Sequence, residues 1–269
     1  MRRLVRFGYD GRAFGGWARQ PGLRTVEGTL REGLLRLGLV TSPDLLRLEV
    51  SSRTDRGVSA RANALTLDVD LALAPLLRAL NGIAPDIFFT AATTVPSSFR
   101  VRDARRRVYR YFEPSFGPDA DRWSRMARWF EGELDVRSFG HGIRWDVPHH
   151  RTVEAVRVLR RGTGLVIEVV GTSFVWHQVR KMIGALRAVE MGDLPESSLR
   201  AAVRGELRIT PPLAEAEHLL LWEVEVPVAW EVFWRGPNRR QRAHFAHARA
   251  LAWSRLELLS ELSATLEGE

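Results

Sequence analysis

The most constraining feature of this sequence is an order of elements that occurs twice along the chain. In the first part, apolar alternation and clustering predict strands at 3–9, 46–51, 63–70 and 87–94. A capping threonine followed by leucines at helical spacing predicts a helix at 26–38, and a proline opens a second helix at 75–80. The resulting order, strand–helix–strand–strand–helix–strand, is the split βαβ pattern, which forms a sheet covered by two helices.

The second part of the chain repeats this order with one additional helix. Its apolar patterns predict strands at 107–113, 152–159, 164–171 and 218–226. Amphipathic stretches predict helices at 119–131, 174–191 and 196–204. We therefore expect an α+β fold of two tandem ferredoxin-like (RRM-like) units, residues 1–104 and 105–227. The units should share one continuous antiparallel sheet, with helices on one face and a cleft between the units.

The charge of the chain restricts its partners. Forty basic residues face 32 acidic ones, which gives a net charge of +8 and a pI near 11.0. Lys181 is the only lysine; a GC-rich coding sequence favours arginine over lysine, but it does not explain the positive excess or its clustering, which indicate a polyanionic partner. The sequence has no cysteine and no apolar run of 18 residues, so disulfides, cysteine-bound metals and a membrane-spanning helix are excluded. We expect a cytoplasmic protein.

The composition changes after residue 227. Residues 228–269 form an extension in which 238–266 predict one further helix, rich in arginine at its start. Leucines then recur on a single stripe at Leu256, Leu259, Leu262 and Leu266. Because an apolar stripe on a helix is normally covered, we expect it to dock on the body or on a second subunit. The basic end would then be free to contact RNA.

A loop between two predicted strands carries the first chemically suggestive segment. Residues 51–60 read Ser-Ser-Arg-Thr-Asp-Arg-Gly-Val-Ser-Ala. Asp55 lies between Arg53 and Arg56, and positive neighbours keep a carboxylate ionised, ready to act as a nucleophile or a general base. Gly57 allows a turn with positive φ and the close approach of a substrate. Taken alone, such a segment is more often a surface loop that holds a local ion pair.

Two further segments combine basic and aromatic residues. Residues 105–111 read Arg-Arg-Arg-Val-Tyr-Arg-Tyr, and in a strand Tyr109 and Tyr111 point to the same face. Arginines there can grip phosphates while a tyrosine stacks on a base, although a basic edge strand with packed tyrosines explains the pattern as well. Residues 173–184 read Ser-Phe-Val-Trp-His-Gln-Val-Arg-Lys-Met-Ile-Gly, and a helix would place Phe174, His177 and Lys181 on one face. By itself, such a histidine is more often a core or capping residue.

Together the three segments resemble the motifs of the TruA-type tRNA pseudouridine synthase family. The first resembles the family's RTDxGV(H/S)A signature, the second its RxYxY motif, and the third its F(L/V)xHxVRx(I/M)(V/I)G string. Shorter resemblances lie at 14–20, 80–87, 99–102 and 151–152, and the whole resemblance extends from about residue 4 to 226. Ser59 stands where bacterial members usually carry histidine, which resembles the archaeal and eukaryotic branch.

The resemblance implies roles for individual residues. Asp55 matches the family's essential aspartate, and Arg180 matches the arginine that pairs with it. Arg53 matches the arginine two residues before the aspartate, and Tyr109 matches the tyrosine that lies against the target base. The resemblance also implies a homodimer that converts uridine to pseudouridine in the anticodon arm of tRNA, at positions 38–40. Such an isomerisation involves no redox change, so we expect neither a cofactor nor a metal.

The remaining basic residues of the motifs complete the expected site. We expect RNA contacts from Arg56, Arg102, Arg106, Arg107, Arg110, His177 and Lys181. A non-catalytic RNA-binding module or RNA chaperone of tandem RRM-like units would also explain the charge and the fold, but it would not need Asp55. A metal-dependent nuclease would need clustered carboxylates, and the sequence offers only Asp68 and Asp70, in a strand.

Overall fold

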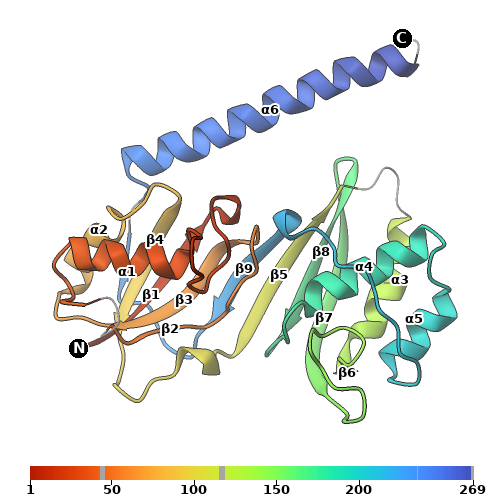
Figure 1. The fold of residues 1–269 in the computed structure, drawn as a ribbon, viewed down its shortest axis with the longest axis horizontal. Coiled ribbons are helices and arrows are strands. Elements are labelled where there is room, and N and C mark those ends of the chain that lie inside the picture. Colours follow the sequence, from red (N-terminus) through yellow and green to blue (C-terminus); the bar gives the residue numbers. More distant parts are fainter. Residues whose placement is uncertain (43–45, 115–118, 235, 268–269) are drawn as a thin grey trace.

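The computed structural model describes residues 1–42, 46–114, 119–234 and 236–267, and its centre is one large mixed sheet flanked by helices (Figure 1). The strands are β1 (Arg2–Tyr9), β2 (Leu48–Val50), β3 (Ser59–Asp68), β4 (Ile87–Thr94), β5 (Arg106–Glu113), β6 (Gly132–Asp135), β7 (His150–Arg161), β8 (Gly164–Gly171), β9 (Leu219–Glu225) and β10 (Val232–Phe233). The α-helices are α1 (Val26–Arg36), α2 (Leu73–Leu80), α3 (Ala120–Ala127), α4 (Gln178–Glu190), α5 (Glu196–Val203) and α6 (Arg239–Glu267). The predicted α+β class is therefore confirmed.

The sheet is continuous, but it is not antiparallel throughout. Its strand order is β10-β4-β1-β3-β9-β5-β8-β7-β6, with β2 beside β3. Neighbours within each half run antiparallel, whereas β3 and β9 meet in parallel through the pairs Ser59–Leu220 and Ala60–Leu221. The prediction of a wholly antiparallel sheet is wrong at this junction. Since β3 runs against β1 and β9 runs against β5, the parallel junction means that β1 and β5 point the same way.

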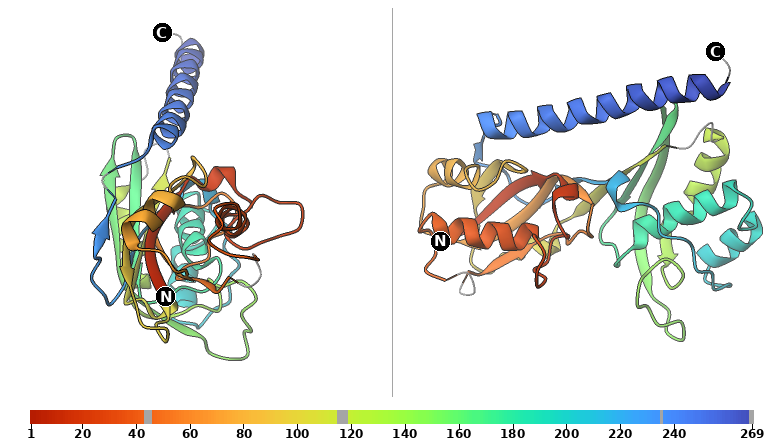
Figure 2. Two further views of the ribbon diagram at one scale, coloured as in Figure 1. Left: turned by 90° about the vertical axis from the view of Figure 1, so that its left-hand side faces the viewer. Right: turned by 45° about the horizontal axis from the view of Figure 1, so that its top comes forward.

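The helices form where the sequence provides caps and apolar faces. Thr25 caps α1, because its Oγ1 accepts a hydrogen bond from the Gly28 N–H at 3.2 Å. Leu30 and Leu34 of the same helix are buried in the core, as their spacing predicts. In the left-hand view of Figure 2, α1 and α4 lie on the same side of the sheet. Both halves therefore bury one face of the sheet under helices.

The long helix of the second half begins later than its sequence predicts. α4 starts at Gln178, and the residue before it, His177, has a φ of 70°. Among the described residues, His177 is the only non-glycine residue with positive φ. The buried Gln178 side chain closes this turn, because its Oε1 accepts a hydrogen bond from the Val175 N–H at 2.9 Å. The predicted helical face of Phe174, His177 and Lys181 is therefore wrong, and the segment that enters α4 is a fixed turn.

Helix α6 leaves the body from an anchored first turn and projects beyond it (Figures 1 and 2). Gln241 is fully buried and donates from Nε2 to Asn81 Oδ1 at 2.8 Å, and Phe245 packs edge-on against Phe88. Farther along, the large apolar side chains are exposed: Leu251, Trp253, Leu256, Leu258, Leu259 and Leu262. Docking of this stripe on the body is wrong for the described leucines, because the anchors hold only the first turns. Docking on a second subunit stays a prediction, and the Leu266 side chain lies outside the described residues. Despite the length of α6, no helix in the described chain is apolar enough to cross a membrane.

Candidate active site

The loop that carries Asp55 is fixed by the first half of the chain. The Trp17 N–H donates to the Thr54 carbonyl at 3.1 Å, and Tyr9 Oη lies 2.7 Å from Thr54 Oγ1. Gly16 has a φ of 108°, and a Cβ there would lie 3.2 Å from both the Thr54 carbonyl oxygen and the Arg56 backbone nitrogen. Gly57 has a φ of 86°, which confirms the positive-φ turn that its identity predicts. The loop therefore presents Asp55 in one defined orientation.

Both carboxylate oxygens of Asp55 are held by residues of the second half. Arg180 Nη1 donates to Oδ2 at 2.9 Å, and Trp176 Nε1 donates to Oδ1 at 2.8 Å. His177 Nε2 lies 3.6 Å from Oδ2. The Asp55 side chain is 21% exposed and that of Arg180 is 12% exposed, so the pair is shielded but reachable. A carboxylate held in this way is aimed in one direction, as a nucleophile or a base requires.

The structure corrects one part of the sequence interpretation of this loop. Among the described residues, the polar partners of Asp55 are Trp176, His177 and Arg180, and neither Arg53 nor Arg56 is one of them. Both of these arginines are exposed and line the cavity described below. The counter-charge of Asp55 therefore comes from Arg180, a residue that is distant in sequence.

Tyr109 lies on β5 behind the aspartate loop. Its residue is 9% exposed, and its ring meets that of Phe174 edge-on with the centroids 5.3 Å apart. Burial raises the pKa of the Tyr109 hydroxyl, so this ring stays neutral. The predicted common face of the two tyrosines is confirmed, since Tyr111 is buried as well.

Asp55 and Tyr109 line a cavity of about 1640 Å³ that both halves of the chain build. Such a volume exceeds the roughly 300–1,000 Å³ of small-molecule pockets, so it suits part of a macromolecule. The first half contributes 12–23 and 50–58, and the second contributes residues of β5, 173–180 and 215–219. In the described part of the chain, no group of three or more His, Cys, Asp or Glu is placed to hold a metal ion.

Three of the predicted RNA-binding arginines bind the protein itself. Arg107 is buried, and its guanidinium donates to the carbonyls of residues 102, 104 and 172 and to Ser51 Oγ. Arg106 pairs with Glu154 at 2.6 Å, whereas Arg110 pairs with Glu168 at 2.8 Å and covers a tryptophan ring. The RNA-binding assignment of Arg107 is corrected, because neighbouring carbonyls occupy its donors. Arg106 and Arg110 are partly exposed, so RNA contacts from them stay predictions.

The other predicted contacts lie at or near the cavity. Arg102 and His177 line it, and burial lowers the pKa of His177, as do the charges of Arg180 and Lys181, although Asp55 opposes the shift. His177 is therefore neutral at neutral pH. Lys181 lies outside the cavity lining: its Nζ donates to the Gly140 carbonyl at 2.8 Å, and burial lowers its pKa.

Two features of the site were not predicted from sequence. One is the contact of Trp176 with Asp55, which joins residues 121 positions apart. The other is a network beside the cavity, in which Arg187 bonds Glu215 at 2.7 Å and Tyr111 Oη donates to the same carboxylate at 2.9 Å. The sequence signal for Trp176 was its position inside the third motif, where an indole N–H donor stands next to His177. No sequence pattern indicates a role for Glu215.

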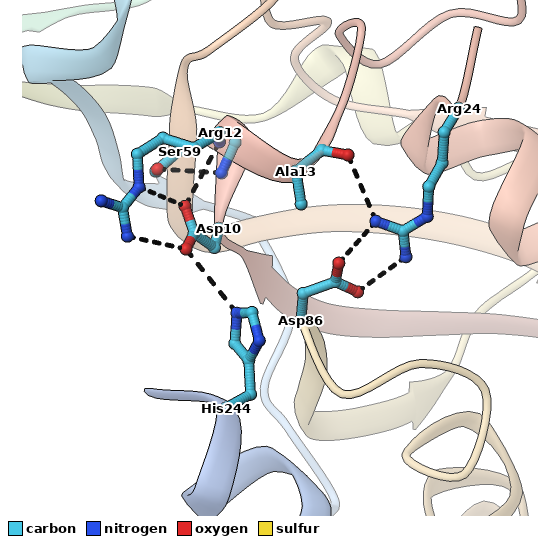
Figure 3. Close-up of polar contacts among 8 residues, drawn as sticks. Asp10, Arg12, Ala13, Arg24, Ser59, Asp86 and His244 are labelled. Atoms are coloured by element: carbon cyan, nitrogen blue, oxygen red, sulfur yellow. Dashed lines mark hydrogen bonds and ion pairs between the residues drawn. The ribbon is translucent and has the colours of Figure 1, made fainter. Parts of the chain in front are cut away.

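The structure also accounts for Ser59 at the start of β3. Its Oγ accepts a hydrogen bond from the Gly11 N–H at 3.0 Å, which holds the short turn η1 (Gly11–Ala13) against the strand (Figure 3). Asp10 caps that turn, pairs with Arg12 at 3.0 Å and lies 3.6 Å from His244 of α6. Since Arg12 lines the cavity, this polar cluster connects the start of α6 to the cavity wall.

The sequence of this chain is similar to those of known proteins. The sequence model of a family described as tRNA pseudouridine synthase matches residues 126–227. Curated proteins named tRNA pseudouridine synthase A match nearly the whole chain: 36% identity in Thermococcus kodakarensis, over 93% of this chain and 95% of the relative, and 35% in Pyrococcus horikoshii, over 92% and 97%. A third, from Methanosphaerula palustris, is 32% identical over 97% of this chain and 92% of its own length. The chain therefore belongs to the tRNA pseudouridine synthase A family.

Proposed function

We propose that this cavity converts a uridine of tRNA to pseudouridine, with Asp55 as the catalytic residue. The observation that carries the proposal is the carboxylate itself: it is held by Arg180 and Trp176 on opposite oxygens inside a cavity of about 1640 Å³. Residues from both halves surround it, so a nucleotide that enters meets a fixed anion and aromatic walls together.

The chemistry needs only groups that the cavity provides. The N1–C1′ bond of the target nucleotide breaks, the uracil turns, and C5 bonds to C1′; C5 loses its proton and N1 gains one, so the product is an isomer of the substrate. Asp55 acts at the sugar–base linkage, either as a nucleophile at C1′ or as a base toward a sugar proton. Both roles require an aimed carboxylate, and the hydrogen bond from Arg180 at 2.9 Å holds Asp55 in one orientation.

The target base must leave its stack before it reaches the carboxylate, at a cost of a few kcal/mol. Contacts between cavity arginines and phosphates offset this cost. We assign phosphate contacts to the exposed residues Arg53, Arg56 and Arg102 at the cavity wall and contact with the target base to Tyr109. His177 completes the pocket beside Asp55.

Finer aspects of the function belong to the same proposal. We propose that the targets are positions 38–40 of the anticodon arm, that the enzyme works as a homodimer, and that it acts in the cytoplasm. We further propose that residues 1–104 and 105–227 are two ferredoxin-like units and that 228–269 is an appended extension. The strand order of each half, with its first strand flanked by two antiparallel neighbours, supports this division.

Mapping pseudouridines in unmodified tRNA after incubation with the purified protein tests the proposal. We expect new pseudouridines at positions 38–40 that are absent with Asp55→Asn. That variant should still bind tRNA within about tenfold (~1.4 kcal/mol) of wild type, because arginines supply the affinity. Asp70→Asn, at an exposed position, is the matched control and should stay active. Binding of tRNA by the wild type without any pseudouridine would instead favour a non-catalytic RNA-binding module, and activity in Asp55→Asn would refute the assigned residue.

A further inference from the structure

Trp176 combines two properties that rarely occur in one side chain. It is 58% exposed, yet its indole N–H is fixed on Asp55 Oδ1 at 2.8 Å. A large apolar ring left open to solvent beside a reactive carboxylate indicates a surface that a ligand covers.

The orientation of the Trp176 ring is set before any RNA arrives. The His141 N–H donates to the Trp176 carbonyl at 2.9 Å, and the His141 ring lies against the indole with centroids 4.3 Å apart. Lys181 ties the same segment through the Gly140 carbonyl at 2.8 Å, and the His177 ring also lies against the indole, with centroids 4.6 Å apart. Stacking on a ring already held in place requires little loss of side-chain entropy.

The position of Trp176 relative to Tyr109 indicates which base it meets. Both residues line the cavity, but Tyr109 is 9% exposed and Trp176 is 58% exposed. Tyr109 therefore lies on the floor, where the target uracil is turned, and Trp176 lies on the rim. The RNA chain that leads to the flipped nucleotide must pass the rim. The uncharged ring suits the face of a base, whereas Arg102 and Arg151 of the same lining suit phosphates.

We propose that Trp176 is a substrate-positioning residue that stacks on the nucleobase next to the target uridine while its indole N–H fixes the Asp55 carboxylate. This inference rests on the proposed function of the cavity. Stacking on an aromatic ring tolerates any base, so the contact adds affinity without adding sequence preference. The same side chain then positions the RNA and orients the Asp55 carboxylate.

Two substitutions separate these roles. Trp176→Phe keeps a flat ring and removes the N–H; we expect its affinity for an anticodon stem-loop RNA to stay within about twofold, while its single-turnover rate falls about tenfold because a hydrogen bond to a charged group is lost. Trp176→Leu removes both, so its affinity should also fall at least about fivefold. Trp253→Leu on α6, which removes a similarly exposed tryptophan far from the cavity, is the matched control and should change neither quantity. Far-UV circular dichroism checks that each variant is folded.

An RNA modified at a single base identifies the stacking partner directly. Two stem-loop RNAs each carry an abasic nucleotide, one on the 5′ side and one on the 3′ side of the target. One of them should bind the wild type at least about fivefold more weakly than intact RNA but bind Trp176→Leu with no further loss. A wild-type rate in Trp176→Phe would overturn the aiming role, and equal losses in wild type and Trp176→Leu for both RNAs would overturn the stacking role. Failure of the proposed function is distinguishable, because the wild type would then form no pseudouridine in intact RNA.

Discussion

Replacement of Arg107 distinguishes a structural arginine from one that binds RNA. The Arg107 residue is 6% exposed, and its guanidinium contacts the carbonyls of Ala104 at 3.1 Å, Arg102 at 2.6 Å and Thr172, together with Ser51 Oγ at 3.1 Å. The contact with Ala104 is fully buried and the others are partly buried. Arg107→Met keeps most of the apolar stem and removes every donor, so these acceptors lose their partner.

The size of the effect follows from the burial of those acceptors. A buried acceptor left without a partner costs roughly 1–3 kcal/mol. We take about 2 kcal/mol for the buried contact with Ala104 and about a third of that for each of the three partly buried contacts. The free energy of unfolding should then fall by about 4 kcal/mol. At about 2–4 °C per kcal/mol for a chain of this size, Tm should fall by about 8–16 °C. Arg106→Met is the control, because it removes two exposed ion pairs of the adjacent residue, with Glu154 and Glu225, each worth at most about 1 kcal/mol.

Two measurements decide whether Arg107 is structural or binds RNA. One is thermal unfolding followed by circular dichroism, and the other is tRNA affinity over a range of salt concentrations. Arg107→Met should be strongly destabilised and, below its Tm, should keep the wild-type dependence of affinity on salt. The reasoning would be refuted if Arg107→Met were as stable as wild type while the slope of log affinity against log salt became shallower by about 0.7–0.9, the value for one lost phosphate contact.

Three further predictions concern the site and the tail. Arg180→Gln should lower the single-turnover rate at saturating tRNA about 10–100-fold with little change in affinity, because Asp55 loses its charged partner; an unchanged rate would contradict this. Although burial opposes it, the Arg187 hydrogen bond lowers the pKa of Glu215 to about 2 from 4.5, so wild type should lose stability as the pH falls below 4.5. In Glu215→Gln the free energy of unfolding, measured by urea titration at several pH values, should fall less steeply below pH 4.5. An identical pH dependence in wild type and variant would contradict the prediction. Replacing Arg239, Arg240 and Arg242 together with alanine should weaken tRNA binding and flatten its salt dependence, while turnover at saturating tRNA stays normal. Unchanged affinity and salt dependence would mean that the tail is only a solvated helix.

Periodicity and turn residues predicted most of the fold because they act locally. The predicted strand at 87–94 coincides with β4, and Thr25 caps α1 as its position predicts. The short strands β6 and β10 were missed, since four and two residues carry no readable alternation. The start of α4 was also missed, because the turn before it is closed by the Gln178 side chain with His177 at positive φ, which apolar spacing does not record. The parallel junction is a property of how two halves meet, which no local pattern records.

The site divides in a similar way. Family motifs placed Asp55, Tyr109 and Arg180 in one cavity, and the structure brings these residues together. Reasoning from sequence neighbours failed for Arg53, because flanking charges on an extended loop need not face the residue between them. It failed for Arg107 as well, since the partners of a buried arginine are backbone carbonyls that no sequence pattern reveals. Contacts across more than a hundred residues, such as that of Trp176, become visible only when both halves are folded.

The division of the site between the two halves has a consequence for biosynthesis. A nascent chain exposes the Asp55 loop from the ribosome long before Trp176, Arg180 and β9 have been made. During that interval the aspartate has no guanidinium beside it and no cavity around it, so it has nothing to aim it at a ribose. The contacts that hold Asp55 can therefore form only late, once the second half has been made and β9 can pair with β3 at Ser59–Leu220 and Ala60–Leu221. Truncated translation products that end before Trp176 therefore contain the signature loop but lack the residues that hold its aspartate.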